Sequence, residues 1–359
     1  GRLLAFAHKE LEGQYNDEEQ DEVEQGLIYD GFVVISDPLS PDVYESIRNC
    51  RSAGIEVKML TGDNIRTARA IANELHMLDD DHIAVEAADI EKLTDEELKE
   101  ALKKIQVIAR STPLVKMRVV KLLKEQGNVV AVTGDGINDA PAIKHADVGI
   151  AMGIAGTDVT KEASDMVLLD DSFSTIIKAV QWGRGIYENF KRFIQFQLTV
   201  NVSSVVVVIC SILAGFSAPF TALELLWINI IMDGPPALTL GLEPIRPDLL
   251  KHKPTRRNEN IISKKMLLRI FVNGIFISVI FMLQHFKNFL GAAPEEEATV
   301  LFTLFVLFQL FNAFNCRELD DTPMFKNLLK NKLMLGVFLL VLILQGIITQ
   351  FGAAVFETV

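Results

Sequence analysis

The alternation of hydrophobic and polar positions divides the chain into two parts of different character. In the first part, short apolar runs alternate with segments in which apolar residues recur at helical spacing. Strands are expected at 2–7, 31–36, 55–60, 107–109, 129–132, 147–152 and 166–169, and helices at 42–53, 68–75, 94–102 and 113–126. Strands that alternate with helices in this way favour an α/β fold with a parallel, doubly wound sheet.

In the second part, long apolar stretches dominate. Five of them approach the length of about 20 residues that a helix needs to cross a bilayer, at 190–214, 223–242, 267–286, 298–315 and 333–351. Basic residues gather in the connections at 243–265 and 317–332, whereas the connections at 215–222 and 287–297 are short or acidic. The positive-inside rule therefore places the basic connections and the soluble part in the cytoplasm. We expect an integral multi-pass membrane protein with an α-helical transmembrane bundle.

Composition narrows the range of partners. Of the 359 residues, 49% are hydrophobic, which is high for a soluble protein and agrees with contact with membrane lipid. The formal net charge of −12 argues against nucleic acid as a partner. The three cysteines lie far apart and have neither the spacing of a metal site nor that of a disulfide framework.

The most informative segment is 129–141, where an apolar run is followed by two carboxylates. Asp135 and Asp139 lie on a glycine-containing turn with Asn138 between them. The carboxyl ends of strands are where open α/β folds build their sites. Two aspartates and an asparagine on a tight turn favour a hard cation such as Mg²⁺, which usually serves phosphate chemistry. An acidic surface turn is the alternative for this segment taken alone.

Two further strand ends carry groups that suit phosphate. Thr61, Gly62 and Asp63 follow the strand at 55–60 and offer a hydroxyl and backbone N–H groups at the start of a helix, where anions are stabilised. Lys116 lies near the start of its own helix, where it can place a positive charge on a phosphoryl oxygen. A simple helix cap at Thr61 and a solvated side chain at Lys116 are the alternatives, and only convergence on one sheet edge favours a site.

An acidic residue interrupts the second apolar stretch. Asp233 lies within it, next to a Gly-Pro-Pro triplet at 234–236 that cannot sustain a regular helix and frees backbone carbonyl groups. With Asn229 four residues earlier, Asp233 predicts a site for a transported cation, to which Asn201 on the preceding stretch is expected to add a ligand. Interhelical hydrogen bonding is the alternative for polar groups inside a membrane.

These motifs, in this order, resemble those of P-type cation-transporting ATPases, and of calcium pumps in particular. The resemblance extends over nearly the whole chain and rests on Asp37-Pro38, Thr61-Gly62-Asp63-Asn64, Lys116, the run Thr-Gly-Asp-Gly-Ile-Asn-Asp-Ala-Pro at 133–141, the glycine-flanked segment 149–153 and Gly183-Arg184. It implies that 1–185 form the C-terminal part of a phosphorylation domain with a haloacid-dehalogenase-like, Rossmann-like α/β fold. Residues 186–359 would then form the transmembrane domain.

The resemblance also implies a role for each candidate residue. The expected catalytic residues, which contact or neutralise the transferred phosphoryl group, are Thr61, Gly62, Asp63, Lys116, Asn138 and Asp139. Asp135 and Asp139 would bind Mg²⁺, while Asp37 and Arg110 would lie near the bound ATP. The residues expected to hold the transported Ca²⁺ are Asn229, Asp233 and Asn201.

Three differences from sarcoplasmic-reticulum-type calcium pumps, which carry two calcium ions, fall on one of the two ion sites. Met232 replaces a threonine, Ser204 replaces a glutamate, and Gln309 stands in place of another glutamate. This pattern resembles that of plasma-membrane-type calcium pumps, which carry one ion. It implies the cell membrane as the location.

The phosphorylated aspartate of the family lies in an Asp-Lys-Thr-Gly-Thr motif, which does not occur in these 359 residues. We therefore expect the N-terminal half of the pump, with this nucleophile, to lie upstream, and we expect the chain alone to be inactive. Two alternatives stay open. One is a membrane-anchored haloacid-dehalogenase-type phosphatase, which would need an upstream Asp-x-Asp nucleophile. The other is a non-catalytic, pump-derived membrane protein that regulates a full-length pump.

Overall fold

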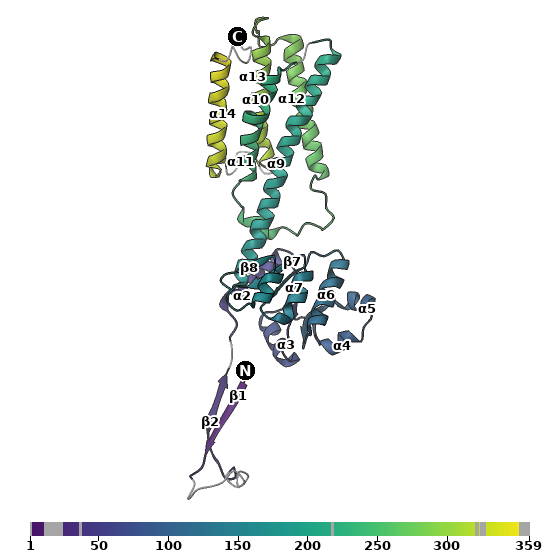
Figure 1. The fold of residues 1–359 in the computed structure, drawn as a ribbon, viewed down its shortest axis with the longest axis vertical. Helices are drawn as coiled ribbons and strands as arrows, with labels where there is room; N and C mark the ends of the chain where they lie inside the picture. The colour runs from purple at the N-terminus through teal and green to yellow at the C-terminus, as the bar shows by residue number, and fades with distance from the viewer. Residues whose placement is uncertain are drawn as a thin grey trace.

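The computed structural model describes residues 2–10, 24–35, 38–216, 219–319, 323 and 328–351. Within these residues the chain forms three parts that follow one another along the long axis of the molecule (Figure 1). A two-stranded hairpin lies at one end, an α/β domain lies in the middle, and a bundle of helices lies at the other end. One long helix runs from the α/β domain into the bundle and belongs to both.

The N-terminal hairpin consists of β1 (Arg2–His8) and β2 (Ile28–Ile35), which pair antiparallel. It projects away from the α/β domain, so the strand expected at 31–36 does not join the parallel sheet, and that part of the prediction is wrong. Its apolar side chains are open to solvent, with Phe6 52% and Phe32 58% exposed. An exposed apolar surface of this kind is typical of a docking surface, and no described part of the chain covers it.

Six parallel strands form the centre of the α/β domain. The alternation of elements predicts the parallel arrangement, but the strand at 83–86 is not among those expected. The six strands make two three-stranded sheets rather than one, in the order β3-β5-β4 and β6-β7-β8. The strands are β3 (Met59–Leu60), β4 (Ile83–Glu86), β5 (Ile105–Ala109), β6 (Ala131–Gly134), β7 (Val148–Met152) and β8 (Met166–Leu168). Because β3 and β6 each stand at the end of a sheet, the candidate phosphate residues that follow them lie at sheet margins.

The helices of this domain are α2 (Pro41–Ser52), α3 (Ile65–Glu74), α4 (Ala87–Glu91), α5 (Asp95–Ala101), α6 (Pro113–Glu125), the 3₁₀ turn η2 (Ile137–Asp139), α7 (Ala140–His145) and α8 (Asp158–Ala163). Four of them, α3, α5, α6 and α8, begin at side-chain caps. The expected capping box opens α5, since Thr94 N–H donates to Glu97 Oε2 at 2.9 Å and Glu97 N–H donates to Thr94 Oγ1 at 3.3 Å. Asn64 and Thr112 cap α3 and α6. A buried aliphatic cluster packs α5 and α6 against β5.

A helix of 41 residues, α9 (Phe173–Leu213), joins the α/β domain to the bundle (Figure 1). At 1.5 Å per residue it is about 60 Å long, roughly twice the thickness of the hydrocarbon core of a bilayer. The sequence predicts a span at 190–214 and a domain boundary near residue 185, but the helix runs without a break through this boundary. At Gly185 it passes so close to the Ile245 side chain that an added Cβ would lie 2.8 Å from it.

Asp42, in the first turn of α2, fastens α9 to the α/β domain. Its Oδ2 accepts hydrogen bonds from Ser172 Oγ at 2.7 Å and from the Ser174 N–H at 3.3 Å. The bond from Ser172, followed by one from Ser40, lowers the pKa of the Asp42 carboxyl from 3.8 to about 2. The ionised carboxylate is therefore the form that holds the two helices together.

Acid is expected to weaken this attachment. A carboxyl whose pKa is lower in the folded state contributes stability that is present above about pH 4 and is lost as the pH falls toward 2. Ser172→Ala removes the principal donor and should return the pKa of Asp42 toward 3.8. The carboxyl carbon resonance of Asp42, followed by NMR against pH, measures this shift, and Ser164→Ala serves as the control. An unchanged pKa in the Ser172→Ala chain would contradict the assignment.

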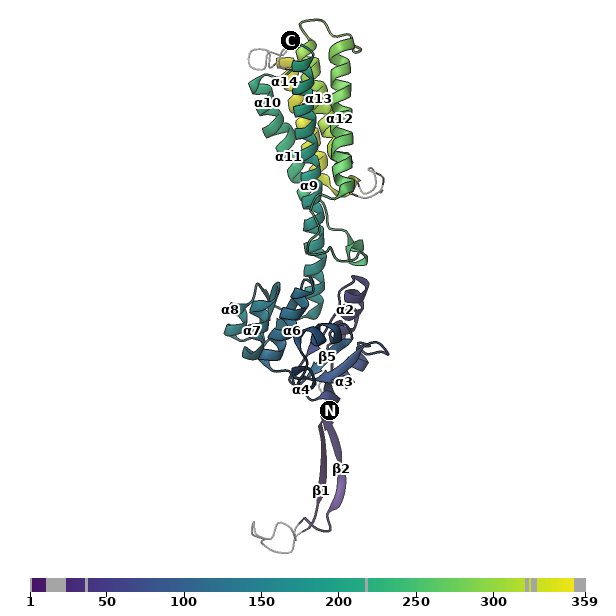
Figure 2. The ribbon, with the colours of Figure 1, turned by 90° about the vertical axis from the view of Figure 1, so that its right-hand side faces the viewer.

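The bundle contains four unbroken helices, counted over the described residues, that are long and apolar enough to cross a membrane. They are α9, α12 (Lys264–Lys287), α13 (Glu297–Cys316) and α14 (Lys332–Phe351), and they lie side by side in both views (Figure 2). The remaining expected span, at 223–242, is divided into α10 (Ala222–Trp227), the π-helical turn η3 (Ile228–Asp233) and α11 (Gly234–Gly241). The irregular turn η3 lies immediately before the Gly-Pro-Pro triplet, whose prolines have no N–H for a helical hydrogen bond and form the start of α11.

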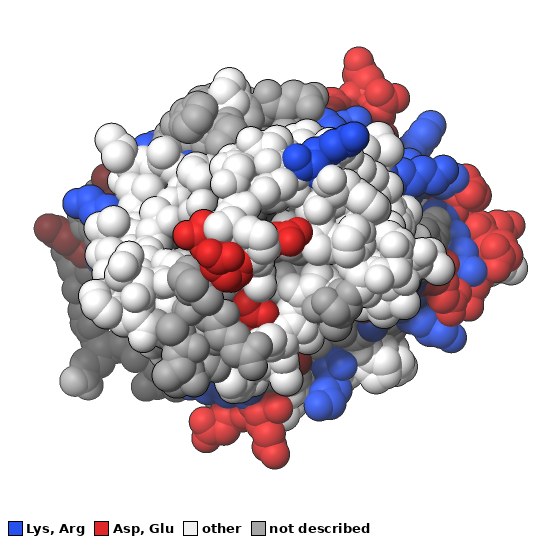
Figure 3. Space-filling model, turned by 90° about the horizontal axis from the view of Figure 1, so that it is seen from above, with Lys and Arg blue, Asp and Glu red and all other residues white. Residues whose placement is uncertain are grey.

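The two ends of the bundle differ in charge. The connections with η4 (Pro247–Lys251) and η5 (Leu328–Lys330) lie at the end nearer the α/β domain and carry the basic residues. The opposite end is mostly uncharged, with a few acidic side chains near its middle, and charged side chains of both signs appear around the outline (Figure 3). Between the two ends, fully buried aromatic side chains such as Phe302 and Phe305 form the core.

Candidate functional site

The loop after β3 is held by the neighbouring strand β5. The Thr61 N–H donates to the Ile108 C=O at 3.0 Å, and the Ser111 N–H donates to the Thr61 C=O at 2.9 Å. The Thr61 hydroxyl accepts from the Asp63 N–H at 3.1 Å, whereas the cap of α3 is Asn64. Thr61 is therefore not the helix cap, and its hydroxyl proton can be donated to a ligand.

Lys116 and Asp139 connect the two parallel sheets. Lys116 lies in the first turn of α6, after β5, and its Nζ is 2.6 Å from Oδ1 of Asp139, which follows β6. The two side chains are only 15% and 14% exposed, so Lys116 is not a solvated surface lysine. Oδ2 of Asp139 also accepts from the Gly136 N–H at 3.2 Å. A Cβ at Gly134 would collide with the Asp139 side chain, which explains the glycine at the end of β6.

Asp135 presents a free carboxylate at the same sheet edge. Its backbone C=O accepts from the Thr157 N–H at 3.0 Å, while its side chain is exposed and forms no hydrogen bond or ion pair within the described residues. Asn138, on η2, is exposed beside it. Mg²⁺ usually takes one or two carboxylates together with water and phosphate oxygens, and Asp135 with Asp139 fits this requirement. The described residues contain no group of three or more His, Cys, Asp or Glu side chains that would bind a metal without a substrate.

Of the two residues expected near ATP, Asp37 lies outside the described residues. Arg110 directly follows β5 in the left-handed conformation, with φ 52°, and its N–H donates to the Asp63 C=O at 2.9 Å. Its side chain is 68% exposed, and its Nε lies 3.8 Å from Glu86. Backbone strain at a residue other than glycine is typical of functional sites. Arg110 therefore borders the Thr61 loop with a guanidinium that a nucleotide can reach.

The cation-site residues of the bundle lie in two environments. Asp233, at the end of η3, is 5% exposed, and its Oδ1 has no hydrogen-bond partner in the described part of the chain. Gln197 of α9 lies beside it. Asn229 and Asn201 are exposed on the outside of the bundle. Asp233 thus has a free oxygen for a cation, but the described chain does not enclose the three residues in one site.

The three positions that distinguish the one-ion pattern lie inside or against the bundle. Met232 and Gln309 are fully buried. Nε2 of Gln309 donates to Ser203 Oγ at 2.5 Å, and Ser204 Oγ donates to the Val200 C=O at 2.9 Å. Gln309 of α13 is therefore bonded to α9, as the alternative of interhelical hydrogen bonding predicts. The bond of Ser204 lies within α9.

The chain matches models of two protein families. Residues 2–147 and 116–180 match haloacid dehalogenase-like hydrolases, and residues 217–359 match the cation transporting ATPase C-terminus. The chain is 41% identical, over its whole length, to calcium-transporting ATPase 12, plasma membrane-type, of Arabidopsis thaliana. It is 44% identical, over 98% of its length, to calcium-transporting ATPase 10, plasma membrane-type, of Oryza sativa subsp. japonica. The chain belongs to the P-type cation-transporting ATPase family. It spans about a third of the length of these curated relatives, 35% of each.

In this member of the P-type ATPase family, the connection after α11 is bound to the start of β6. Nη1 of Arg257 donates to the Asn128 C=O at 3.0 Å and to Asp147 Oδ2 at 3.2 Å. The same Oδ2 accepts from the Val130 N–H at 3.0 Å. Partial burial opposes ionisation of Asp147, but the Val130 N–H, Arg257 and Lys124 together hold its pKa below the ordinary value. The membrane part and the strand that carries Asp135 are thereby joined through one carboxylate.

Arg184 of α9 holds the same connection from the other side. Its Nη1 donates to the C=O groups of Leu249 at 3.0 Å and His252 at 2.8 Å, and its Nη2 donates to the Ala53 C=O at 2.8 Å. Sequence reasoning missed the contacts of Arg184 and Arg257. From the sequence, the basic residues of this connection indicate only the orientation in the membrane.

The pair Arg257–Asp147 is expected to contribute a small, measurable coupling between the two parts. A double-mutant cycle with Arg257→Ala and Asp147→Ala should give an interaction free energy on the order of 1 kcal/mol, because Arg257 is partly exposed and water screens the pair. Thermal unfolding in detergent measures the four members of the cycle. Arg256→Ala, at an exposed neighbouring arginine, is the control and should be neutral. Strict additivity of the two substitutions would show that the contact contributes nothing.

Proposed function

We propose that this chain is the C-terminal part of an ATP-driven calcium pump of the cell membrane. The observation that carries the proposal is α9, one continuous helix that begins at the Asp42 anchor of the α/β domain and ends in the bundle that holds Asp233. A single stiff element therefore links the domain that carries the phosphate-type site to the bundle that holds a buried, incompletely bonded carboxylate. Such a link is what the coupling of phosphoryl transfer to ion transport requires.

In the complete pump, Asp135 and Asp139 would hold Mg²⁺, which would supply positive charge to neutralise the phosphates. Lys116, oriented by Asp139, places its ammonium group on an oxygen of the transferred group. The Thr61 hydroxyl donates to another oxygen. The remaining residues of this site, which contact the phosphates or the nucleotide, are Gly62, Asp63, Asn138, Arg110 and Asp37.

The acceptor aspartate of the pump comes from the upstream half of the protein. Two features support a place for it between β3 and β6. Each of these strands stands at the end of its sheet, and Val129, just before β6, is 61% exposed although it is apolar. A parallel strand inserted there would join the two sheets and bring its own carboxyl end beside Thr61 and Asp135. The exposed apolar hairpin likewise supports a partner from the upstream half.

Calcium is the proposed cargo of the membrane site. The free Oδ1 of Asp233 supports cation binding, and carboxylate and amide oxygens suit Ca²⁺. Asn229 and Asn201 would complete the ligands on the side that the described chain leaves open. An amide side chain in contact with lipid is energetically unfavourable, so the exposure of these two residues supports the proposal that further spans from the upstream half cover them. The basic connections beside the α/β domain support its placement in the cytoplasm.

Calcium-dependent phosphoenzyme formation from labelled ATP tests the proposal. We expect label on the full-length product and none on the 359-residue chain, which lacks the Asp-Lys-Thr-Gly-Thr acceptor. Membranes that hold equal amounts of the two products are compared with and without a calcium chelator. Label on the 359-residue chain alone, or label on the full-length product that ignores the chelator, would overturn the proposal.

A further inference from the structure

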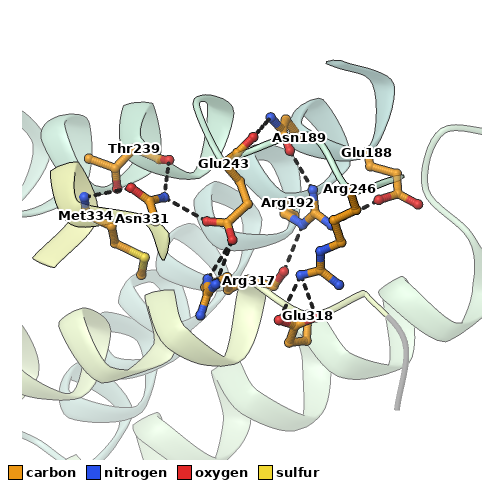
Figure 4. A network of polar contacts seen from close by, with 10 residues as sticks. All are labelled: Glu188, Asn189, Arg192, Thr239, Glu243, Arg246, Arg317, Glu318, Asn331 and Met334. Carbon is orange, nitrogen blue, oxygen red and sulfur yellow. Dashed lines mark hydrogen bonds and ion pairs between the residues drawn. The ribbon is translucent and has the colours of Figure 1, made fainter. Parts of the chain in front are cut away.

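A network of buried charged and amide side chains closes the end of the bundle nearer the α/β domain (Figure 4). At its centre is Arg317, which follows α13. Its Nε donates to Glu243 Oε1 at 2.8 Å, and its Nη2 lies 2.8 Å from the same oxygen. The side chains of Arg317 and Glu243 are 0% and 3% exposed. Because Glu243 follows α11, this pair ties the broken span to α13.

Two asparagines complete the attachment of α11. Asn331, just before α14, donates to Glu243 Oε2 at 2.7 Å and to the Thr239 C=O at 3.2 Å. Asn189 of α9 donates to the C=O groups of Gly241 at 3.2 Å and Glu243 at 2.7 Å. The last carbonyl groups of a helix have no partner within the helix. Side chains from two neighbouring spans therefore cap α11 and fix its end (Figure 4).

The surrounding charges are paired as well. Nη2 of Arg246 lies 2.8 Å from both carboxylate oxygens of Glu318. Arg192 of α9 donates to the Arg317 C=O at 2.8 Å and lies 3.0 Å from Glu188. Buried ion pairs stabilise a fold poorly, since apolar residues of similar volume usually do as well or better. The best-attested use of such pairs is to fix one register of packed helices.

We propose that Glu243 and Arg317 are positioning residues for the cation site at Asp233. This inference rests on the proposed function. About 15 Å of helix separates Asp233 from Glu243. The ion pair and the two asparagines hold the far end of α11 against α13, α14 and α9. Because α11 cannot then slide as a whole, a change in the shape of η3 moves the Asp233 carboxylate.

The segment between the two ends has the softness that this role requires. π-helical turns such as η3 are rare, and they occur frequently at functional sites. Pro235 and Pro236 remove two donors from the next turn. One end of the broken span is therefore deformable and the other is fixed, and the position of Asp233 depends on the fixed end.

The test is made in the full-length pump with Glu243→Met and Arg317→Met combined, so that no unpaired charge is left buried. We expect membrane insertion and heat stability close to those of the parent. The half-saturating Ca²⁺ for phosphoenzyme formation should rise about tenfold, which is within the range by which a substitution between two distant sites changes their coupling, with half-saturating ATP unchanged. A general loss of stability would change the half-saturating concentrations of Ca²⁺ and ATP together, so a rise for Ca²⁺ alone indicates a specific effect on the cation site. The matched control combines Arg246→Met and Glu318→Met, the neighbouring pair, whose side chains form no hydrogen bond or ion pair with α11 among the described residues.

A second variant, Asn331→Ala, leaves the charge unchanged and removes three hydrogen bonds. Two are those that Asn331 donates to Glu243 and Thr239, and the third is the one that its Oδ1 accepts from the Met334 N–H at 2.9 Å. This variant should raise the half-saturating Ca²⁺ about threefold, and it decides the matter if the double methionine variant does not accumulate. An unchanged calcium dependence in the variants that accumulate would overturn the proposal, as would an equal rise in the control pair. A parent pump without calcium-dependent phosphorylation would overturn the proposed function, and this inference with it.

Discussion

Replacing Asp233 by Asn in the full-length pump is expected to abolish calcium-dependent phosphorylation from ATP at physiological calcium. The Asp233 side chain is 5% exposed, and one of its carboxylate oxygens has no partner in the described chain. Asparagine keeps the shape of the side chain but removes the charge that attracts a divalent cation. Loss of a carboxylate ligand should lower the affinity for Ca²⁺ by about 100-fold or more.

Phosphoenzyme formation from labelled ATP over a range of calcium concentrations measures this loss. Asp248→Asn, at an exposed acid on η4 outside the bundle, is the control and should leave the calcium dependence unchanged. Aspartate at 233 would have no part in cation binding if the Asp233→Asn pump kept the calcium dependence of the parent.

Asp135→Asn is expected to abolish phosphorylation by ATP altogether while leaving folding and membrane insertion unaffected. Its carboxylate is exposed and makes no bond within the described residues, so its removal breaks no contact of the fold. Its proposed contribution is to Mg²⁺, whose charge neutralises the phosphates in transfer, and loss of such a ligand should cost about 1,000-fold or more in rate.

The amount of phosphoenzyme formed in a fixed time, normalised to the protein in the membrane, gives the effect. Asp158→Asn, at an exposed acid in the first turn of the nearby α8, is the matched control. A normal level of phosphoenzyme in the Asp135→Asn pump would remove Asp135 from the magnesium site.

Local signals account for most of what the sequence predicts correctly. The apolar run before Asp135 forms β6, and the Thr94 capping box opens α5, because each depends on residues close in sequence. Lys116 and Asp139 meet as expected, because both follow the carboxyl ends of parallel strands, although these strands, β5 and β6, belong to different sheets. The metal, nucleotide and cation roles of these residues stay predictions.

The sequence does not indicate which distant strand or side chain a given residue contacts. An apolar alternation identifies β2 as a strand but does not say that it pairs with β1 rather than with the parallel sheet. Arg257 and Arg317 look alike in the sequence, as basic residues near a span. One binds Asp147, 110 residues away, and the other is fully buried against Glu243. Only the packing of the helices distinguishes them.

The length of α9 sets the scale of the movement that a small rotation produces. A tilt of about 5° around the Asp42 anchor displaces the far end of a helix of about 60 Å by about 5 Å. A calcium ion is held by oxygens at about 2.3–2.6 Å, so shifts of this order are enough to assemble or dismantle its coordination shell. If the chain is part of a calcium pump, as proposed, α9 would act as a lever that turns a change of a few degrees at the Asp42 anchor into the opening or closing of the ion site.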